Sequence, residues 1–332
     1  MSSLNPFYKT LDNKIECLLC RHYCKLKEGQ VGVCGVNKNE NNRLVNLVYG
    51  KVSAINIDPI EKKPLYHFLP ATTSLSIGTV GCNFKCPFCQ NWQISQSKSL
   101  DNSYSVTPQQ LVEIALDRGC KSISYTYNEP TIFYPFAKDV ALLAKEAGLK
   151  NIFVSNGFET PEVIDDMVGV IDAFNIDIKG FKSEYYKKYL KGELNGVLDT
   201  LKQLKKRGFW VECTTLIVPE DNDSDQELRD IAEFIAKELD VNTPWHISAF
   251  HPDYKVTSKE ATPIETLQRA YTIGKEAGLN FIYMGNTLNT NTTLCPNCSK
   301  SLIKRVGFEV IEDRLKDGRC PRCNSEIAGV WR

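Results

Sequence analysis

The stretch Gly81-Cys82-Asn83-Phe84-Lys85-Cys86-Pro87-Phe88-Cys89 decides how the rest of the chain is interpreted. Three cysteines within so few residues indicate a metal site, because thiolates at this density have little other use. A closed zinc site needs four protein ligands, and an iron–sulfur cluster normally takes four cysteines. The stretch therefore predicts a metal centre with one coordination position left open. The alternative is a zinc knuckle completed by a distant residue such as His67.

The spacing of three residues and then two between the cysteines, with Phe88 before the last, resembles the signature of the radical S-adenosylmethionine (SAM) superfamily. The resemblance implies that Cys82, Cys86 and Cys89 hold three irons of a [4Fe–4S] cluster and that the amino and carboxylate groups of SAM chelate the fourth. It also implies that one electron from the cluster cleaves SAM to methionine and a 5′-deoxyadenosyl radical, which abstracts hydrogen from a substrate.

Length and composition allow a large core and limit the classes of partner. With 332 residues, 42% of them hydrophobic, the chain is expected to form two domains or one barrel with small appendages. Lys and Arg number 40 and so do Asp and Glu, which argues against nucleic acid or an anionic membrane as the main partner. No apolar run approaches the roughly twenty residues of a membrane span, and Met1–Thr10 lacks the apolar core of a signal peptide, so a cytoplasmic protein is expected.

Eleven of the 13 cysteines fall into three clusters, which indicates metal binding in a reducing compartment rather than disulfides. The first cluster is Cys17, Cys20, Cys24 and Cys34, a complete ligand set with glycines at the intervening turns. Residues 1–42 are therefore predicted to be a small metal-binding segment. Zinc is the preferred metal because all four positions are filled, with an auxiliary [4Fe–4S] cluster as the alternative.

The last cluster consists of two Cys-Pro-X-Cys pairs, which predict a zinc ribbon over residues 291–332, with 302–310 as hairpin strands. Its ligands would be Cys295, Cys298, Cys320 and Cys323. A single iron would use the same ligands. A site closed by four cysteines has no open position for chemistry, so the ribbon is expected to fold the tail or to recognise a partner. Cys120 and Cys213 lie outside the clusters and are expected to be buried packing residues.

Residues 43–73 are predicted to be a hairpin and a lead-in loop. Apolar and polar residues alternate over 43–57 around Gly50, which favours a β-hairpin. The following stretch, 58–70, has too many prolines and charges for a regular element and predicts a long ordered loop. Lys63, Tyr66 and His67 are its candidates for facing the active site, the alternative being a solvated surface.

From residue 74 to 290, short apolar runs alternate with longer amphipathic segments, which predicts βαβ units and a parallel sheet. The expected architecture is α/β: a partial (β/α)6 TIM-like barrel, with ligands at the carboxyl ends of its strands. Strands are expected at 74–80, 121–126, 151–155, 172–178, 209–217, 244–249 and 280–284. Helices are expected at 107–118, 131–147, 161–168, 194–207, 224–238 and 263–277.

The residues that follow these strands are the candidates for binding SAM. Tyr127-Asn128-Glu129-Pro130 stands where radical SAM enzymes have a Gly-Gly-Glu motif, so the resemblance places Asn128 and Glu129 near the SAM amino group. A carboxylate suits an ammonium partner, although Glu129 would equally cap a helix beginning near Thr131. The pair Tyr127-Asn128 in place of two glycines is a departure from the usual motif.

Three further strand ends carry weaker signals. Ser155 and Asn156 lie in a segment similar to the Thr-Asn-Gly segment of activating enzymes of the pyruvate formate-lyase type, although an ordinary turn would look the same. Asp177 and Lys179, two residues apart, would point the same way, either toward the cofactor or as a salt bridge at the barrel mouth. His251 follows the strand at 244–249 and is a candidate contact for substrate or adenine, with a structural histidine as the alternative.

Taken in order, several motifs together resemble the radical SAM enzyme of the AmmeMemoRadiSam system, which is related to pyruvate formate-lyase activating enzymes. They are the four cysteines of 17–34, the stretch 58–68, the stretch 81–92, the motif 127–130 and the terminal Gly329-Val330-Trp331. The resemblance implies a [4Fe–4S] cluster, SAM and partner proteins of the Memo and AMMECR types. A flavodoxin or ferredoxin would supply the electron.

The main functional hypothesis is reductive SAM cleavage followed by hydrogen abstraction from an organic substrate. The second hypothesis keeps the chemistry but makes the substrate a glycyl-radical enzyme. The third is a scaffold without catalysis, held together by three zinc sites. Iron at Cys82, Cys86 and Cys89 would argue for catalysis, and zinc alone would argue for the scaffold.

Overall fold

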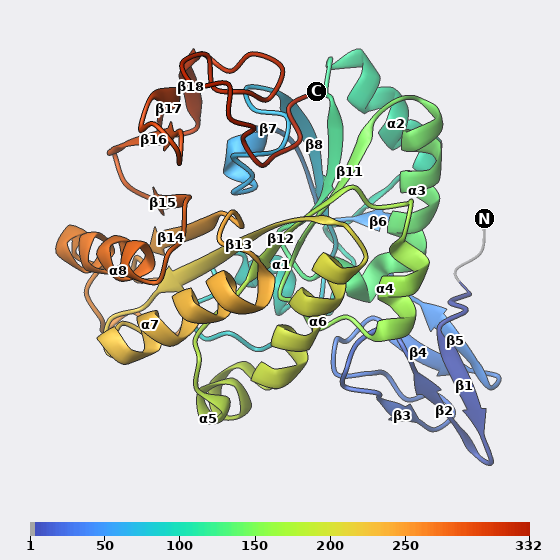
Figure 1. Ribbon diagram of the computed structural model, residues 1–332. Coiled ribbons are helices and arrows are strands. Elements are labelled where there is room, and N and C mark those ends of the chain that lie inside the picture. Colours follow the sequence, from blue (N-terminus) through green and yellow to red (C-terminus); the bar gives the residue numbers. More distant parts are fainter. Residues whose placement is uncertain (1–3) are drawn as a thin grey trace.

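The computed structural model describes residues 4–332, and its centre is one eight-stranded sheet (Figure 1). Strands that follow one another along the chain lie side by side, in the order β15-β14-β13-β12-β11-β10-β8-β7. Edge strand β7 (Ala54–Pro59) is antiparallel to β8 (Thr73–Gly78), and the other strands pair in parallel. The remaining strands are β10 (Ser122–Tyr125), β11 (Lys150–Ser155), β12 (Ala173–Asp177), β13 (Trp210–Ile217), β14 (Trp245–Ala249) and β15 (Ile282–Gly285).

One main helix follows each parallel strand except the last, and these helices lie around the outside of the curved sheet (Figure 1). They are α2 (Pro108–Asp117), α3 (Tyr134–Glu146), α4 (Pro161–Met167), α6 (Leu194–Lys206), α7 (Asp225–Phe234) and α8 (Ile264–Glu276). Within residues 4–332 no ladder joins β15 to β7. The predicted partial barrel is therefore confirmed, as six β–α units followed by a seventh parallel strand.

Four short helical pieces were not predicted from the sequence: η1 (Ile60–Lys62), α1 (Trp92–Ser95), α5 (Ser183–Tyr185) and η3 (Tyr186–Leu190). Two others, η2 (Pro130–Phe133) and η4 (Ile235–Leu239), lie largely within the helices expected at 131–147 and 224–238. A helix of one turn has no apolar periodicity to detect, because periodicity needs several turns. The longer helices carry ordinary start signals: at α2, Thr107 and Gln110 form a capping box and Pro108 occupies the first position.

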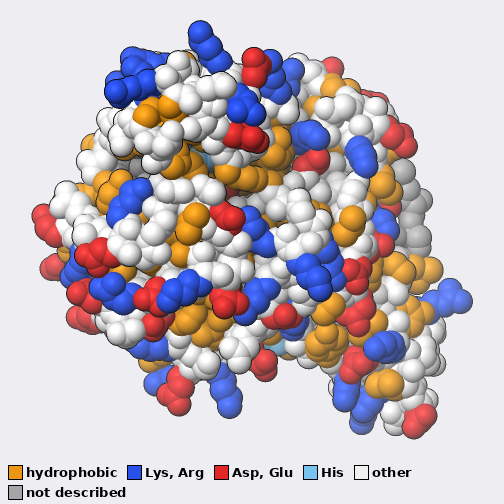
Figure 2. All heavy atoms as spheres, viewed as in Figure 1, with side chains coloured by type: hydrophobic (Ala, Val, Ile, Leu, Met, Phe, Trp, Pro, Cys, Tyr) orange, Lys and Arg blue, Asp and Glu red, His pale blue; other side chains and the backbone are white. Residues whose placement is uncertain are grey.

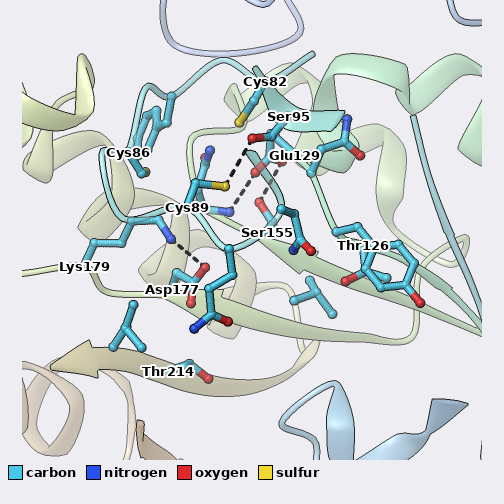
Figure 3. Close-up of a pocket in the computed structure, with 18 of the residues that line it drawn as sticks. Cys82, Cys86, Cys89, Ser95, Thr126, Glu129, Ser155, Asp177, Lys179 and Thr214 are labelled. Atoms are coloured by element: carbon cyan, nitrogen blue, oxygen red, sulfur yellow. Dashed lines mark hydrogen bonds and ion pairs between the residues drawn. The ribbon is translucent and has the colours of Figure 1, made fainter. Parts of the chain in front are cut away.

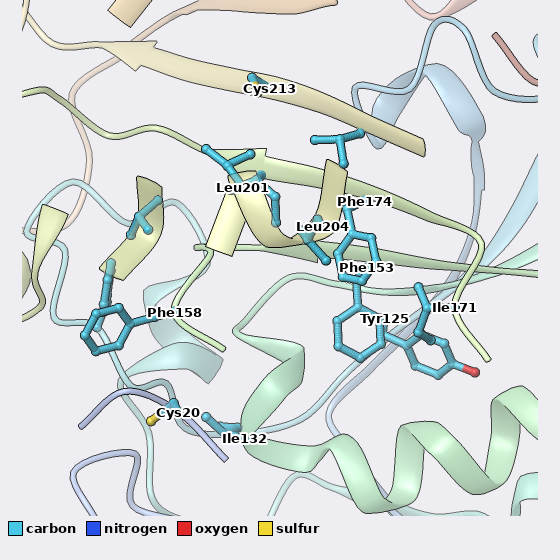
Figure 4. Packing of buried hydrophobic residues seen from close by; sticks show 14 of the residues in the cluster. Cys20, Tyr125, Ile132, Phe153, Phe158, Ile171, Phe174, Leu201, Leu204 and Cys213 are labelled. Atoms are coloured by element: carbon cyan, nitrogen blue, oxygen red, sulfur yellow. The ribbon is translucent and has the colours of Figure 1, made fainter. Parts of the chain in front are cut away.

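The main core lies between the sheet and its helices (Figure 4). Tyr125, Phe153 and Phe174 come from neighbouring strands, and successive ring centroids are 5.3 and 5.8 Å apart. Such contacts between aromatic rings on adjacent strands stabilise the sheet. Cys213 is fully buried in the same core and Cys120 is nearly so, which confirms their expected packing role.

The loop after β7 enters the barrel and meets the end of the chain there. Glu212 on β13 accepts hydrogen bonds from the backbone N–H groups of Tyr66, at 3.0 Å, and His67, at 2.8 Å. Phe68 forms a β-bridge with Val330. The long loop predicted for 58–70 therefore fills the inside of the barrel rather than its surface.

His67 has a fixed protonation pattern in this position. Its Nδ1 lies 2.7 Å from the carbonyl oxygen of Ala328, and its Nε2 lies 2.6 Å from the hydroxyl of Tyr283. Because a carbonyl only accepts, Nδ1 carries the hydrogen and Nε2 accepts from Tyr283. Burial lowers the pKa of His67 to about 4. Both nitrogens of His67 are engaged and His67 does not line the cavity of Cys82, Cys86 and Cys89, so it is not placed to complete a zinc knuckle with them.

The hairpin predicted for 43–57 is wrong. Its residues are divided among three sheets: β5 (Arg43–Asn46) pairs with β4 (Asn37–Glu40), β6 (Lys51–Val52) with β9 (Tyr104–Ser105), and β7 with β8. Alternation of apolar and polar residues along a strand does not identify its partner. The domain boundaries predicted from the sequence stay a prediction.

Two cysteine-rich units flank the barrel at opposite corners in Figure 1. The first contains β1 (Tyr8–Leu11), β2 (Lys14–Cys17) and β3 (Lys25–Leu26) as one antiparallel sheet, next to β4 and β5. The second contains β16 (Thr290–Leu294), β17 (Ser301–Val306) and β18 (Glu309–Asp313), also antiparallel. Its four thiol sulfurs all lie within 4.8 Å of one another, close enough to hold one metal ion.

The surface matches the balanced composition. On the face shown in Figure 2, acidic and basic side chains are interspersed. Among residues 4–332 no helix is long and apolar enough to cross a membrane.

We expect the free energy of unfolding to fall as the pH is lowered from about 6.5 to about 4, because of the depressed pKa of His67. The pKa is depressed from 6.5 to about 4, so its contribution to stability is fully present above 6.5 and is lost as pH falls toward 4. A shift of that size corresponds to a loss on the order of 3 kcal/mol. Urea unfolding of wild type and His67→Gln between pH 7 and pH 4 measures it. The advantage of wild type should shrink on acidification, and parallel loss in both proteins would contradict the assignment.

Candidate functional site

A cavity of about 290 Å³ lies at the carboxyl ends of the parallel strands (Figure 3). Parallel α/β folds bind their ligands at this edge. The residues predicted from the sequence that line it are Cys82, Cys86, Cys89, Asn128, Glu129, Ser155, Asn156, Asp177 and Lys179. The others are Pro64, Phe84, Phe88, Gln90, Asn91, Ser95, Thr126, Tyr127, Val154, Thr214, Leu216, Ser248 and Asn286.

The three cysteines lie on the loop between β8 and α1. The loop begins at Gly81, whose φ of +89° and tight surroundings require glycine: a Cβ there would lie 2.6 Å from the carbonyl oxygen of Cys34. Cys86 is buried and the other two thiols are partly buried. The Sγ atom of Cys89 lies 3.1 Å from the hydroxyl oxygen of Ser95 on α1. All three cysteines line the cavity (Figure 3).

The spacing of these sulfurs differs from that of the C-terminal ribbon. Among residues 4–332, only the ribbon has three or more potential ligand atoms that all lie within 4.8 Å of one another. Ligands of a single tetrahedral ion must be that close, since each metal–sulfur bond is only ~2.3 Å. The irons of a [4Fe–4S] cluster occupy separate corners, so its terminal thiolates stand farther apart. The three cavity thiols therefore fit a cluster better than they fit one ion.

Asn128 fixes the start of this loop. Its side-chain oxygen accepts from the backbone N–H of Thr79 at 3.1 Å, and its side-chain nitrogen donates to the carbonyl of Gly81 at 2.8 Å. Its amide is thus engaged by the loop while the residue also lines the cavity. We interpret Asn128 as a positioning residue.

Glu129 is buried and accepts hydrogen bonds on both oxygens. Oε1 accepts from the backbone N–H of Thr131 at 3.0 Å and from the hydroxyl of Ser155 at 2.9 Å. Oε2 accepts from the backbone N–H of Asn156 at 2.7 Å. Glu129 caps the short helix η2, as one interpretation of the sequence expected. It also lines the cavity, so the same carboxylate has both roles.

Glu159 is a member of this group that the sequence did not reveal. It is fully buried, and the hydroxyl oxygens of Ser155 and Thr131 lie 2.5 and 3.2 Å from its Oε1. Both hydroxyls also lie within hydrogen-bond distance of Glu129 Oε1, and because each has one hydrogen it donates to only one of the two carboxyls at a time. Burial, followed by the charge of Glu159, raises the pKa of Glu129 to about 7, and burial also raises that of Glu159. Nothing in the local sequence indicated it, because the contact with Glu129 joins two loops that are distant in sequence.

Asp177 and Lys179 form an ion pair at the end of β12, with Nζ and Oδ2 2.7 Å apart (Figure 3). Burial opposes the charge on Lys179, but Asp177 and then Cys86 raise its pKa above the usual value, so the side chain stays protonated. Both residues line the cavity. The pair places one positive and one negative charge beside Cys86.

The other predicted residues are placed as follows. His251 is exposed and does not line the cavity, although its Nε2 lies 2.8 Å from the side-chain nitrogen of Gln90, which does. Tyr66 and His67 face the barrel interior instead. Lys63 is buried, pairs with Asp58 at 2.6 Å, and lies over the ring of Tyr127, which lines the cavity.

The lining fits a zwitterionic cofactor next to a cluster. Asn156 donates to the side-chain oxygen of Asn83 at 2.8 Å, but its own Oδ1 is buried and has no partner among residues 4–332. A buried acceptor without a donor fits a ligand that donates, such as an ammonium or a hydroxyl. Glu129 and Asp177 could take up an ammonium, and Lys179 a carboxylate.

The curved parallel sheet places three thiols and a pair of opposite charges at the edge where parallel α/β enzymes bind their ligands. Residues 76–235 match the model of the family described as the radical SAM superfamily. The chain is 44% identical over 327 residues, 97% of each chain, to uncharacterized protein MJ0808 of Methanocaldococcus jannaschii. It is 30% identical over 191 residues, 55% of this chain and 75% of the relative, to putative glycyl-radical enzyme activating enzyme MJ1227 of that organism.

The fold agrees with this sequence similarity. The crystal structure of a radical SAM methyltransferase from Sphaerobacter thermophilus superposes with a TM-score of 0.53 at 14% identity, over 66% of this chain and 68% of that one. The chain belongs to the radical SAM superfamily, whose members use a [4Fe–4S] cluster and SAM.

We expect the raised pKa of Glu129 to lower stability as pH rises. Its pKa moves from 4.5 to about 7, so its contribution to stability is present below 4.5 and is lost as pH rises through 7. In Glu129→Gln this loss, on the order of a few kcal/mol, should disappear from the curve of unfolding free energy against pH. Cluster-free protein should be compared with the exposed control Glu113→Gln, which should follow wild type. Identical curves for all three proteins would refute the shift.

Proposed function

We propose that this chain binds a [4Fe–4S] cluster through Cys82, Cys86 and Cys89 and cleaves SAM reductively. The observation that carries the proposal is the set of three thiols that line one cavity without all lying within 4.8 Å of one another, while the described lining includes no histidine and no fourth cysteine. Bound there, a reduced cluster supplies the electron that splits SAM into methionine and a 5′-deoxyadenosyl radical, which abstracts hydrogen from an organic substrate.

The residues of this chain hold the cysteine loop in place and would bind and orient SAM. Asn128 ties Thr79 to Gly81 and so sets the start of the cysteine loop. Glu129 presents a carboxylate that Ser155 and the backbone of Asn156 hold in one orientation, which suits the ammonium of SAM. We assign Lys179 as the partner of the SAM carboxylate. The free oxygen of Asn156 would accept a hydrogen bond from the cofactor. His251 would support the site indirectly, through its contact with Gln90.

The widely spaced thiols argue against a scaffold held by three zinc sites, and family membership supports an enzyme. The substrate is less constrained. Similarity to a putative glycyl-radical enzyme activating enzyme favours a second candidate, in which the hydrogen comes from a glycine of a partner enzyme. Electron spin resonance of candidate partner proteins after turnover separates the two, because a glycyl radical on the partner has its own signal.

We also propose the finer assignment to the AmmeMemoRadiSam system, based on the resemblance of the motifs along the whole chain. It brings with it partners of the Memo and AMMECR types, a flavodoxin or ferredoxin as electron donor, and action in the cytoplasm. For the ribbon we propose zinc, because four clustered thiols suit one tetrahedral ion.

Replacing one cavity thiol should abolish the chemistry. Cys86→Ala, reconstituted under anaerobic conditions, should lack the iron–sulfur absorption band of its cavity site and should release no 5′-deoxyadenosine when reduced with SAM. The control Cys120→Ala removes a buried thiol outside every cluster and should keep both properties. The proposal fails if Cys86→Ala still assembles this cluster and cleaves SAM.

A further inference from the structure

The N-terminal cysteines form a second four-thiol site, and their arrangement is unlike that of the ribbon. Cys17, Cys20 and Cys34 are buried and Cys24 is partly buried. A Cβ on Gly32 would lie 3.6 Å from the Sγ of Cys24 and 3.7 Å from that of Cys34, so these two thiols flank one glycine.

The N-terminal sulfurs are not gathered as closely as those of the ribbon. In the described part of the chain, the ribbon alone gathers three or more ligand atoms within 4.8 Å of one another, and no three of the N-terminal sulfurs do so. This is the same contrast that separates the cavity thiols from the ribbon. Four cysteines filling all positions, at a spacing too wide for a tetrahedral ion, fit a complete [4Fe–4S] cluster.

The N-terminal site also lies directly against the loop of the cavity cysteines. The carbonyl oxygen of Cys34 lies 2.6 Å from where a Cβ on Gly81 would be, and Gly81 precedes Cys82. Standard bond lengths and the ~3.8 Å between consecutive Cα atoms put the Cα atoms of Cys34 and Cys82 no more than roughly 10 Å apart. A second contact joins the Nε2 of His22 and the carbonyl oxygen of Asn83, at 2.9 Å.

The contact with the SAM-site loops is just as close. Cys20 forms a β-bridge with Glu159, and the hydroxyl of Thr160 donates to the carbonyl of Leu18 at 2.6 Å. Asn37 directs its side-chain nitrogen both to the Sγ of Cys34, at 3.5 Å, and to the carbonyl of Ile132, at 2.8 Å. Hydrogen bonds to cysteine sulfur are among the features that set the potential of a cluster.

One side of the site opens to solvent. Cys24 lines a shallow surface depression together with Lys25, Val31 and Val33, and the last three side chains are exposed. Within the N-terminal site, Cys24 therefore lies at the surface, while Cys34 lies against the loop that contains Cys82. A zinc ion in this place would be redox-inactive.

We propose that Cys17, Cys20, Cys24 and Cys34 hold a second [4Fe–4S] cluster, which relays electrons to the cluster at Cys82, Cys86 and Cys89. A flavodoxin- or ferredoxin-type protein gives one electron to the N-terminal cluster. That cluster is oxidised again as it reduces the cavity cluster by one electron, so no electron is left over. The identity of the metal stands by itself, whereas the relay rests on the proposed function. The preference for zinc drawn from the sequence alone is thereby replaced.

Metal analysis tests the identity of the site. The variant Cys82→Ser/Cys86→Ser/Cys89→Ser lacks the cavity ligands and should retain about four irons and about four sulfides per chain, with the Mössbauer spectrum of a [4Fe–4S] cluster. Zinc at this site with no iron would overturn the proposal. The matched control Cys298→Ser/Cys323→Ser should lose only the metal of the ribbon.

Wild-type protein gives a second measurement that does not depend on the folding of a variant. About eight irons per chain are expected, and SAM should alter the electron spin resonance signal of only one of the two reduced clusters. About four irons with two zinc ions per chain would overturn the proposal, yet would leave SAM cleavage at the cavity intact. Failure of this inference is therefore distinct from failure of the proposed function.

The relay is tested by comparing reductants. In Cys24→Ser/Cys34→Ser, the rate of 5′-deoxyadenosine release with reduced flavodoxin, divided by the rate with dithionite, should fall relative to wild type. Dithionite is small enough to reach the cavity cluster without the relay. An unchanged ratio would overturn the relay.

Discussion

The parallel pairing of β8, β10, β11 and β12 is the constraint on which the site depends. Because all four strands run the same way, their carboxyl ends meet at one edge of the sheet, and the loops that follow them must share that space. The cysteine loop, the Asn128–Glu129 turn, the Ser155–Asn156 turn and the Asp177–Lys179 pair all come from these ends. Antiparallel pairing at any of these positions would send one of the four loops to the other side.

The electrostatics of the cavity follow from burial. The hydroxyls of Ser155 and Thr131 lie between Glu129 and Glu159 in a place with little solvent, and each has a hydrogen for only one carboxyl, so one of the two carboxyls binds a proton more readily than usual. A cationic group arriving beside Glu129 would compensate the charge that burial disfavours. Lys179 differs from the two glutamates because Asp177 and Cys86 favour its charged form and raise its pKa in spite of burial. The site thus contains fixed charges of both signs before any ligand binds.

The chain arranges cysteines in two different ways. In the ribbon, two short turns bring four sulfurs together, as a single tetrahedral ion requires. Around the cavity and in the N-terminal segment, the sulfurs stay farther apart and the backbone between them is packed against the barrel. The N-terminal segment packs behind the loops that line the site: Cys34 lies against Gly81 of the cysteine loop, and Cys20 forms a β-bridge with Glu159.

By itself the sequence determined the features that depend on local patterns. The Cys82–Cys89 spacing, the alternation of strands and helices and the ribbon could be predicted because ligand spacing and hydrophobic periodicity are properties of short segments. Only the tertiary structure decided which strands pair with residues 43–57, that His67 is locked inside the barrel, and that Glu159 lies beside Glu129. It also decided how far apart the N-terminal sulfurs stand. Each of these depends on contacts between residues distant in sequence, and local periodicity contains no information about such contacts.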